Sequence, residues 1–561
     1  MQMVNPSGPA PKNAVLLTAA LLAAKVVLLF VFAINTRFVM DEFWQFGQAK
    51  YLGHGLFDTI WPAKAVGYAV FYKFAHVIGW DAISMLITGR LQVAVLGCAT
   101  LGVVYALARA IGENHWRSLA IVLLLLCFST FMERIFRLRA EPLALFFAAS
   151  ALLVVVQGRA DSGRRLLVAG ILSGLAFLST QKSIYFNGAL GLALLSDAAA
   201  GKRYIAGIRR GALLVLGWII PVLAYCLLFG GSEAAAIAKN LFFGPVEVAT
   251  TGQIYYESLR GYVSQTLRRN VLLYVACVRG LMIAIRKFKT LAPPRRIALV
   301  FTIVVTVLVF AHNQPWPYVF IMALPFLALW VLGPLEDFSG RTARMAVAAV
   351  LVLAVALSFW RNVTYLEHDN TDQLAVIASA DRLLSRDATY FDGMGMLQNH
   401  IETPRIWLDA RGVYLTQKDG QQSVVYKTLS ETPPDLIIRS YRTEALKSLL
   451  QPLLENRYQA ISPNIMLPGR ALTDGTETDF DPPVAGSYDV YGEDGLPAAG
   501  RIQVDGGWQS LPVSLPSGKH ALAFEANEAG AEYYLLPAGL RLQSLRPTQT
   551  PDVLFEAVYD F

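Results

Sequence analysis

The sequence predicts a polytopic α-helical membrane protein with a C-terminal extracytoplasmic region, an α/β domain followed by a β-sandwich. Composition is the first observation: of 561 residues, 55 % are hydrophobic and 16 % are charged, whereas soluble domains carry roughly 25 % charged residues. Second, nearly all the long apolar runs precede Trp360. Third, Lys and Arg cluster in alternate short loops between these runs, as membrane topology requires.

The apolar runs predict about eleven membrane spans, because a helix needs roughly 20 apolar residues to cross the bilayer core. They cover residues 13–34, 89–110, 117–135, 141–157, 166–181, 183–198, 211–230, 270–286, 296–312, 316–334 and 343–360. Residues 13–34 are too long for a signal-peptide core, so they are expected to remain as the first span. The shorter run 65–79 is predicted to be an amphipathic helix at the interface with the membrane lipids.

The basic clusters predict the orientation. They follow the fourth, sixth, eighth and tenth spans, at Arg159, Arg164 and Arg165, at Lys202, Arg203, Arg209 and Arg210, at Arg286, Lys287, Lys289, Arg295 and Arg296, and at Arg341 and Arg344. Because cytoplasmic loops are rich in Lys and Arg, the N-terminus is predicted to be cytoplasmic. The protein is then expected in a bacterial inner membrane, with its C-terminal region in the periplasm. Arg268 and Arg269 fall on the outer side, where they need either a different topology or an anionic partner.

Three domains are expected, over residues 1–360, 361–475 and 476–561. In the second, helical stretches such as TDQLAVIASADRLLSR alternate with short apolar runs, which indicates an α/β domain. In the third, strand-like runs such as GRIQVDGGW are separated by Gly, Pro and Asn, which indicates a β-sandwich. The four cysteines lie in apolar segments without metal-ligand spacing, so no disulfide framework or structural zinc is expected. The tail has no basic face with interleaved aromatics, and nucleic acid is not an expected partner.

Two carboxylates, Asp41 and Glu42, begin the first outer loop. A carboxylate pair at the water interface could act as a general base or hold a divalent cation, so a divalent metal ion is an open alternative. The other interpretation is an ordinary helix N-terminus, where acidic residues favour the helix dipole.

Cationic side chains are expected at the same outer face. The stretch ERIFRLRAEPLALFF, residues 133–147, places Arg137 and Arg139 beside Glu141, between the third and fourth spans. Lys64 lies in the first outer loop and Lys182 in a tight outer turn. Such cations could hold a phosphate, although a single one serves as readily as a lipid-headgroup anchor.

Tyr255, Tyr256 and His312 could line the same cavity, or could be ordinary aromatic-belt residues. There is no Walker A loop and no dinucleotide-binding GxGxxG between a strand and a helix, so nucleotide-driven chemistry has no support. No GxSxG elbow occurs in the tail.

The order of these features resembles superfamily C of the integral-membrane glycosyltransferases (GT-C), in its aminoarabinose transferase and protein O-mannosyltransferase branch. The stretches that resemble it are DEFWQFGQAKYL, PAKAVGYAVFY, RLRAEPLALFF, FLSTQKS and HNQPWPYVFIMALPFLAL, spread along residues 13–360. The resemblance implies that Asp41 is the catalytic base or a metal-linked residue. It also implies that Glu141 is the second acidic site and that Lys64 steadies the donor phosphate.

This resemblance implies a cell-envelope glycosyltransferase, of the kind that modifies lipopolysaccharide. It would move a sugar from a polyprenyl-phosphate donor to a glycan or lipid acceptor with inversion. A lipid-linked donor also follows from the topology, because soluble nucleotide sugars are confined to the cytoplasm. The expected catalytic residues are Asp41, Glu42 and Glu141; Lys64, Arg137, Arg139 and Lys182 would bind the donor phosphate, and Tyr255, Tyr256 and His312 would line the substrate cavity. The alternatives are a flippase or transporter for lipid-linked sugars and a ligase-like envelope protein.

Overall fold

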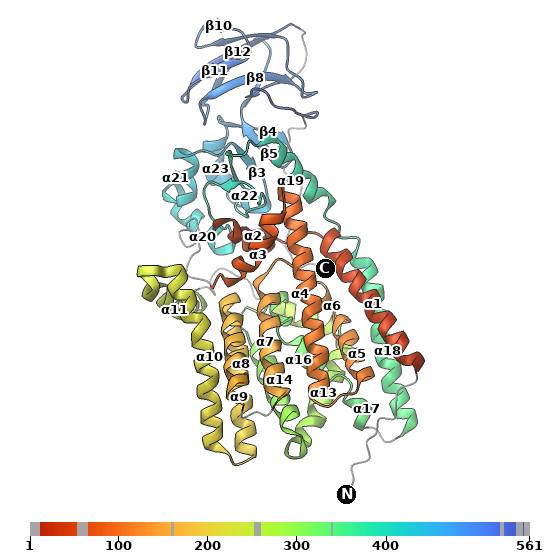
Figure 1. The fold of residues 1–561 in the computed structure, drawn as a ribbon. Helices are drawn as coiled ribbons and strands as arrows, with labels where there is room; N and C mark the ends of the chain where they lie inside the picture. Colours follow the sequence, from red (N-terminus) through yellow and green to blue (C-terminus); the bar gives the residue numbers. More distant parts are fainter. Residues whose placement is uncertain are drawn as a thin grey trace.

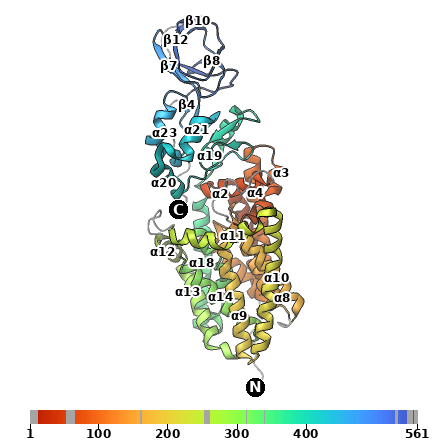
Figure 2. The same ribbon diagram turned by 90° about the vertical axis from the view of Figure 1, so that its left-hand side faces the viewer.

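The computed structural model describes residues 12–52, 65–158, 162–251, 260–312, 314–337, 340–527, 532–545 and 554. A bundle of long helices forms one half of the molecule, and an α/β domain and a β-sandwich follow it along one axis (Figures 1 and 2). This is the predicted architecture, a helical membrane-protein half followed by mixed and then β-rich parts.

The helical half runs from α1 to α18. The helices are α1 (Lys12–Asn35), α2 (Met40–Gly47), α3 (Gly67–Ile78), α4 (Ala82–Ala110), α5 (His115–Leu126), α6 (Ser129–Met132), α7 (Ala140–Val156), α8 (Gly163–Ser179), α9 (Ile184–Ala200), α10 (Tyr204–Gly230), α11 (Ala234–Thr251), α12 (Arg260–Arg269), α13 (Val271–Arg286), α14 (Pro293–Phe310), α15 (Pro317–Phe320), α16 (Leu324–Ala328), α17 (Pro334–Asp337) and α18 (Arg341–Tyr365). The short 3₁₀ helix η1 (Gln48–Tyr51) continues α2, and η2 (Gln181–Ser183) joins α8 to α9.

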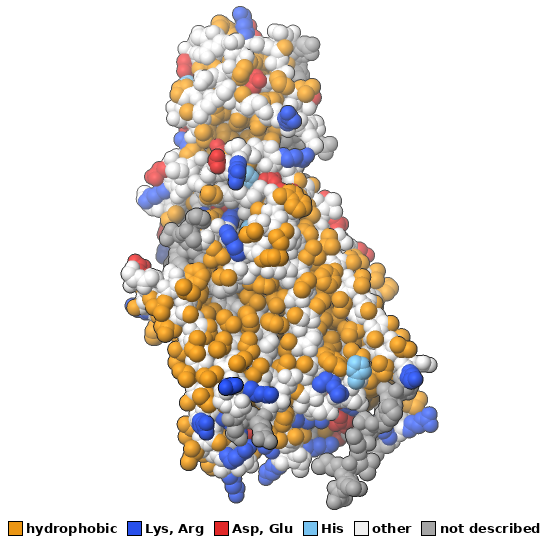
Figure 3. All heavy atoms as spheres, in the orientation of Figure 1, with side chains coloured by type: hydrophobic (Ala, Val, Ile, Leu, Met, Phe, Trp, Pro, Cys, Tyr) orange, Lys and Arg blue, Asp and Glu red, His pale blue; other side chains and the backbone are white. Residues whose placement is uncertain are grey.

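Five helical stretches of the described chain are long and apolar enough to cross a membrane: Lys12–Asn35, Ala82–Ala110, Tyr204–Gly244, Pro293–Phe310 and Arg341–Tyr365. The shorter helices α7, α8, α9 and α13 coincide with other predicted spans. Hydrophobic side chains cover this half as a broad band, and Lys and Arg side chains gather at its end away from the tail (Figure 3).

The tenth predicted span, residues 316–334, is broken. Pro317 opens α15, Pro325 lies in the first turn of α16 and Pro334 opens α17, with turns between these pieces. Proline lacks the N–H that an uninterrupted helix needs, so apolar length alone overestimated the helix here. The segment is buried from Tyr318 to Leu332. It approaches α13 so closely that a Cβ on Gly280 would lie 1.9 Å from the Trp330 carbonyl oxygen.

The α/β domain contains a five-stranded sheet of order β2-β1-β3-β5-β4. Strand β1 (Thr389–Phe391) runs parallel to β2 (Ile401–Glu402) and β3 (Leu436–Ile438), and β5 (Ile465–Pro468) runs antiparallel to β3 and to β4 (Tyr458–Ser462). Its helices are α19 (Thr371–Leu383), α20 (Ala410–Asp419), α21 (Val424–Glu431), α22 (Tyr441–Glu444) and α23 (Lys447–Leu454).

The last part is a sandwich of two antiparallel four-stranded sheets around one apolar core, with the orders β10-β9-β12-β7 and β11-β8-β13-β6. The strands are β6 (Arg470–Leu472), β7 (Glu477–Phe480), β8 (Gly486–Gly492), β9 (Gly500–Val504), β10 (Gly507–Gln509), β11 (Val513–Leu515), β12 (His520–Ala526) and β13 (Tyr533–Pro537). Because β6 pairs with β13, the sandwich begins before the expected boundary at 475/476. A three-residue strand is too short to show an alternating pattern.

Candidate active site at the junction of the helical half and the tail

Glu42, in the first turn of α2, is the centre of a fully buried ionic cluster. Its carboxylate accepts hydrogen bonds from Arg90 of α4 at 2.6 and 2.9 Å and from Arg137 at 2.7 Å. The backbone N–H groups of Val39 and Leu138 also donate to it. Burial by itself would raise the pKa of Glu42, but the charges and hydrogen bonds of Arg90 and Arg137 lower it to about 2. Glu42 is therefore an ionised anchor that fixes the start of α2 to α4 and to the 133–139 segment.

A second cluster, the open cluster, contains Asp41, Arg139, Glu141 and Lys182. The Arg139 guanidinium pairs with Asp41 and, at 3.1 Å, with Glu141 in the first turn of α7. Lys182 of η2 donates to the other oxygen of Glu141 at 2.9 Å. The side chain of Asp41 is 16 % exposed, against 2 % for Glu141 and 0 % for Glu42. Of these three carboxylates, Asp41 is the most exposed to solvent.

An aromatic ring forms the floor of this cluster. The guanidinium carbon of Arg139 lies 3.5 Å from the ring centroid of Tyr318, and Nζ of Lys182 lies 4.4 Å from it. Such cation–π contacts hold both cations in place. In the sequence, Tyr318 follows the outer turn NQPWP, where aromatics are common, and no pattern there distinguishes it from an ordinary interfacial aromatic.

Arg137 and Arg139 are two residues apart but have different partners. Arg137 donates to Glu42 and, at 2.7 Å, to the hydroxyl of Tyr365 at the end of α18. Its contacts are thus those of the buried cluster. Arg139 belongs to the open cluster around Asp41, and its carbonyl oxygen accepts a hydrogen bond from Tyr72 of α3 at 2.7 Å.

The remaining predicted residues are only partly described. His312 follows α14, and its ring lies 5.9 Å from that of Tyr185, three residues after Lys182. Lys64, Tyr255 and Tyr256 lie outside the described residues.

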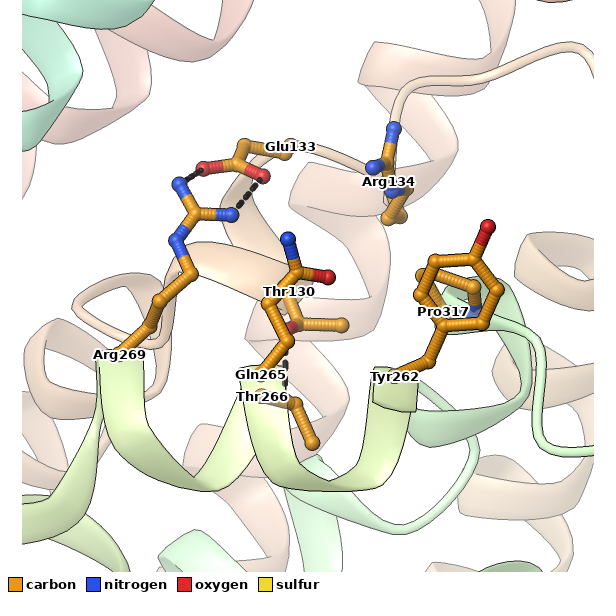
Figure 4. A pocket seen from close by; sticks show the side chains of 8 residues that line it. All are labelled: Thr130, Glu133, Arg134, Tyr262, Gln265, Thr266, Arg269 and Pro317. Atoms are coloured by element: carbon orange, nitrogen blue, oxygen red, sulfur yellow. Dashed lines mark hydrogen bonds and ion pairs between the residues drawn. The ribbon is translucent and has the colours of Figure 1, made fainter. Parts of the chain in front are cut away.

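A small pocket lies beside the site, between α6, α12 and the start of α15. Its lining residues are Thr130, Glu133, Arg134, Tyr262, Gln265, Thr266, Arg269 and Pro317 (Figure 4). Glu133 binds Arg269 with both oxygens, at 2.7 and 3.0 Å, which is the anionic partner that an arginine on the outer side needs. The space inside is about 10 Å³, room for about one water molecule.

The carboxylates are not arranged as a metal site. Among the described residues, no group of three or more His, Cys, Asp and Glu side chains is placed to hold a metal ion. Asp41 and Glu141 pair with the same Arg139 guanidinium, so a cation of the chain already balances their charge. These residues therefore do not fit a shared metal ion in this arrangement.

Residues of the tail contact the start and the middle of α2. These contacts could not be predicted from the sequence. Gln373 of α19 hydrogen-bonds both the N–H and the carbonyl of Phe38, at 2.7 and 3.1 Å. The indole of Trp407 stacks on Trp44 with ring centroids 5.7 Å apart. These contacts fix the backbone on both sides of Asp41.

The family models that match this chain divide the tail near the boundary between the α/β domain and the β-sandwich. Two family models match the tail, both described as domains of unknown function: DUF7056 over residues 415–467 and DUF7055 over residues 470–537. No curated protein matches the sequence.

Solved structures resemble the chain in fold. The crystal structure of ArnT from Cupriavidus metallidurans bound to undecaprenyl phosphate has a TM-score of 0.59 at 14 % identity, covering 80 % of this chain and 97 % of that one. For apo ArnT the values are 0.55, 14 %, 81 % and 98 %. The apo oligosaccharyltransferase of Archaeoglobus fulgidus gives 0.44 at 11 % identity, covering 90 % and 75 %. The two ArnT structures, both with TM-scores above 0.5, show that the chain has the GT-C-like fold that the order of its motifs predicted.

Proposed function

We propose that this protein is a membrane glycosyltransferase that moves one sugar from a polyprenyl-phosphate donor to a hydroxyl of a glycan or lipid acceptor, with inversion. The observation that supports this best is the open cluster, in which Arg139 joins Asp41 and Glu141 and Lys182 completes the set. It combines a partly exposed carboxylate, Asp41, with two cations that Glu141 holds in place. The cluster lies at the end of the apolar helical bundle that faces the tail. The fold of ArnT, a protein crystallised with undecaprenyl phosphate, agrees with such a donor.

The proposed reaction is a single displacement at the anomeric carbon. The acceptor oxygen attacks this carbon and its proton passes to Asp41, while the bond to the phosphate oxygen breaks and the electron pair leaves with the phosphate. Arg139 and Lys182 stabilise the negative charge that develops there, with Lys64 as a further predicted ligand. Glu141 acts by holding Arg139 and Lys182 in place. Glu42 and Arg137 position the start of α2 against the 133–139 segment.

The proposed location is the bacterial inner membrane, with a cytoplasmic N-terminus and a periplasmic tail. Lys and Arg side chains gather at the end of the bundle away from the tail (Figure 3), which supports this orientation. The candidate site lies at the opposite end, next to the tail. There the donor must be lipid-linked, which suits an apolar chain held among the helices.

Replacing Asp41 tests the proposal. In cells that lack the protein, we expect a lipid-linked sugar to accumulate and a glycan to lose one sugar. When these cells are given the Asp372→Asn variant as a control, transfer should be restored, since Asp372 is an exposed residue of α19. Asp41→Asn should lower turnover by about 10²-fold to 10⁴-fold. Purified Asp41→Asn should still bind undecaprenyl phosphate, because a base is needed for reaction and not for capture.

Two outcomes would contradict the proposal. Full transfer by Asp41→Asn would remove Asp41 as the base. A wild-type protein that equilibrates the lipid-linked sugar across vesicles without transferring it would be a transporter.

A further inference from the structure

A cation from the tail lies next to the catalytic helix. Arg442 belongs to α22, which lies directly over α2 (Figure 1). Its Nη2 is 3.4 Å from the sulfur of Met40, the residue before Asp41, and the hydroxyl of Tyr441 is 2.5 Å from the same sulfur. The tail therefore delivers a positive charge to the edge of the open cluster.

Arg442 has weak partners for a half-buried arginine. Among the described residues, no carboxylate forms an ion pair with it, and its buried Nε has no hydrogen-bond acceptor. A thioether sulfur is only a weak acceptor. Arg439, three residues earlier, pairs with Glu444 at 3.1 Å. Withdrawing a charge from water without a counter-ion is unfavourable, so the position of Arg442 favours an anionic ligand.

The local structure sets this position in advance. The hydroxyl of Ser440 accepts hydrogen bonds from the backbone N–H groups of Arg442 and Thr443, at 3.3 and 3.4 Å. The backbone N–H of Ser440 in turn donates to the hydroxyl of Thr443 at 2.7 Å. The guanidinium lies 4.7 Å from the ring centroid of Tyr441. Burial raises the pKa of Tyr441, Arg442 opposes this rise and Asp41 adds to it, so Tyr441, which the guanidinium contacts, lies within electrostatic reach of Asp41.

We propose that Arg442 binds a phosphate group of a substrate held against Asp41. A guanidinium offers parallel N–H donors that match phosphate oxygens. The choice of phosphate rests on the proposed function, in which the polyprenyl-phosphate donor carries this group. In the open cluster, Arg139 and Lys182 are already shared with carboxylates, whereas Arg442 brings an uncompensated charge.

The test is binding to the purified full chain in lipid nanodiscs, which does not depend on turnover. The probes are undecaprenyl phosphate, with undecaprenol as its neutral counterpart, and inorganic phosphate. Arg442→Ala should weaken the binding of at least one phosphate probe by about tenfold or more, since charge-assisted hydrogen bonds are lost. Arg442→Lys should retain part of the affinity. Arg382→Ala is the matched control, because Arg382 is exposed and, within the described part of the chain, its guanidinium bonds only to its own helix.

The pattern of losses identifies the source of the phosphate. A loss for undecaprenyl phosphate alone assigns Arg442 to the carrier lipid, and a loss for inorganic phosphate alone assigns it to a phosphate outside the membrane. Wild-type affinity for both probes in Arg442→Ala and Arg442→Glu would overturn the inference. The proposed function would survive that result if the wild type still transfers sugar, and it would fail separately if the wild type binds the lipid without transfer.

Discussion

At the residue scale, Asp41 and Glu42 are adjacent in sequence but have opposite surroundings. The sequence could name both as candidates. It could not separate them, because their difference depends on Arg90, which lies in the first turn of a predicted span some fifty residues later. Only folding brings Arg90 and Arg137 onto Glu42 and leaves Asp41 to Arg139.

Glu42→Gln should destabilise the protein strongly. It leaves Arg90 and Arg137 buried without their counter-charge, and breaking a buried ionic cluster costs roughly 3–5 kcal/mol. Thermal unfolding in detergent measures this. Glu525→Gln, which breaks the exposed pair with Arg501, should cost at most about 1 kcal/mol. Equal midpoints for the two variants would contradict the anchoring role of Glu42.

The same contact has a pH dependence. The pKa of Glu42 lies near 2, below its usual value of 4.5, so the folded state binds the proton less readily than the unfolded one. The stabilisation is therefore complete above about pH 4.5 and is lost as the pH falls through about 2. In Glu42→Gln, this contribution to the acid unfolding profile should be absent.

At the element scale, prediction worked where length and apolarity decide the structure. The helices α1, α4, α14 and α18 lie where long apolar runs predicted them, and a helix occupies 67–78 as the amphipathic pattern predicted. It failed at α15–α17, where prolines divide a run of sufficient length. The contacts between the tail and α2 could not be predicted either, because they join residues more than 300 positions apart, such as Phe38 and Gln373.

Gln373→Ala should reduce turnover while leaving the binding of undecaprenyl phosphate unchanged. The amide satisfies both backbone groups of Phe38, so its loss lets α2 shift and misplaces Asp41. A displacement of about 1 Å can cost up to 10²-fold in rate. Steady-state kinetics should show the fall in kcat with little change in KM for the donor. Gln417→Ala, an exposed glutamine of the same domain, should behave as wild type; a matching loss there would point to general destabilisation of the tail.

At the scale of the whole molecule, the order of the three parts could be predicted because each has its own pattern of hydropathy and turns. Their contacts could not, since a sequence pattern shows which face is apolar but not what covers it. The orientation of the bundle is a proposal that rests on the distribution of Lys and Arg.

Single cysteines test the orientation. In a background without the four native cysteines, Ser448→Cys on α23 and Thr290→Cys between α13 and α14 place thiols at exposed positions of opposite ends. In intact spheroplasts, a membrane-impermeant thiol reagent should label position 448 and not position 290. Disrupted membranes serve as the control, in which both should react. Labelling of 290 alone in intact spheroplasts would reverse the topology.

The first and last helices of the membrane half end side by side. The N–H of Asn370, just beyond α18, donates to the carbonyl of Asn35 at the end of α1, and His368 accepts from the N–H of Arg37. The tail is therefore tethered within a few residues of α2. Such a tether gives a high effective concentration, so individually weak contacts suffice to keep the domain docked. A different domain joined at the same place would be held next to α2 at the same effective concentration.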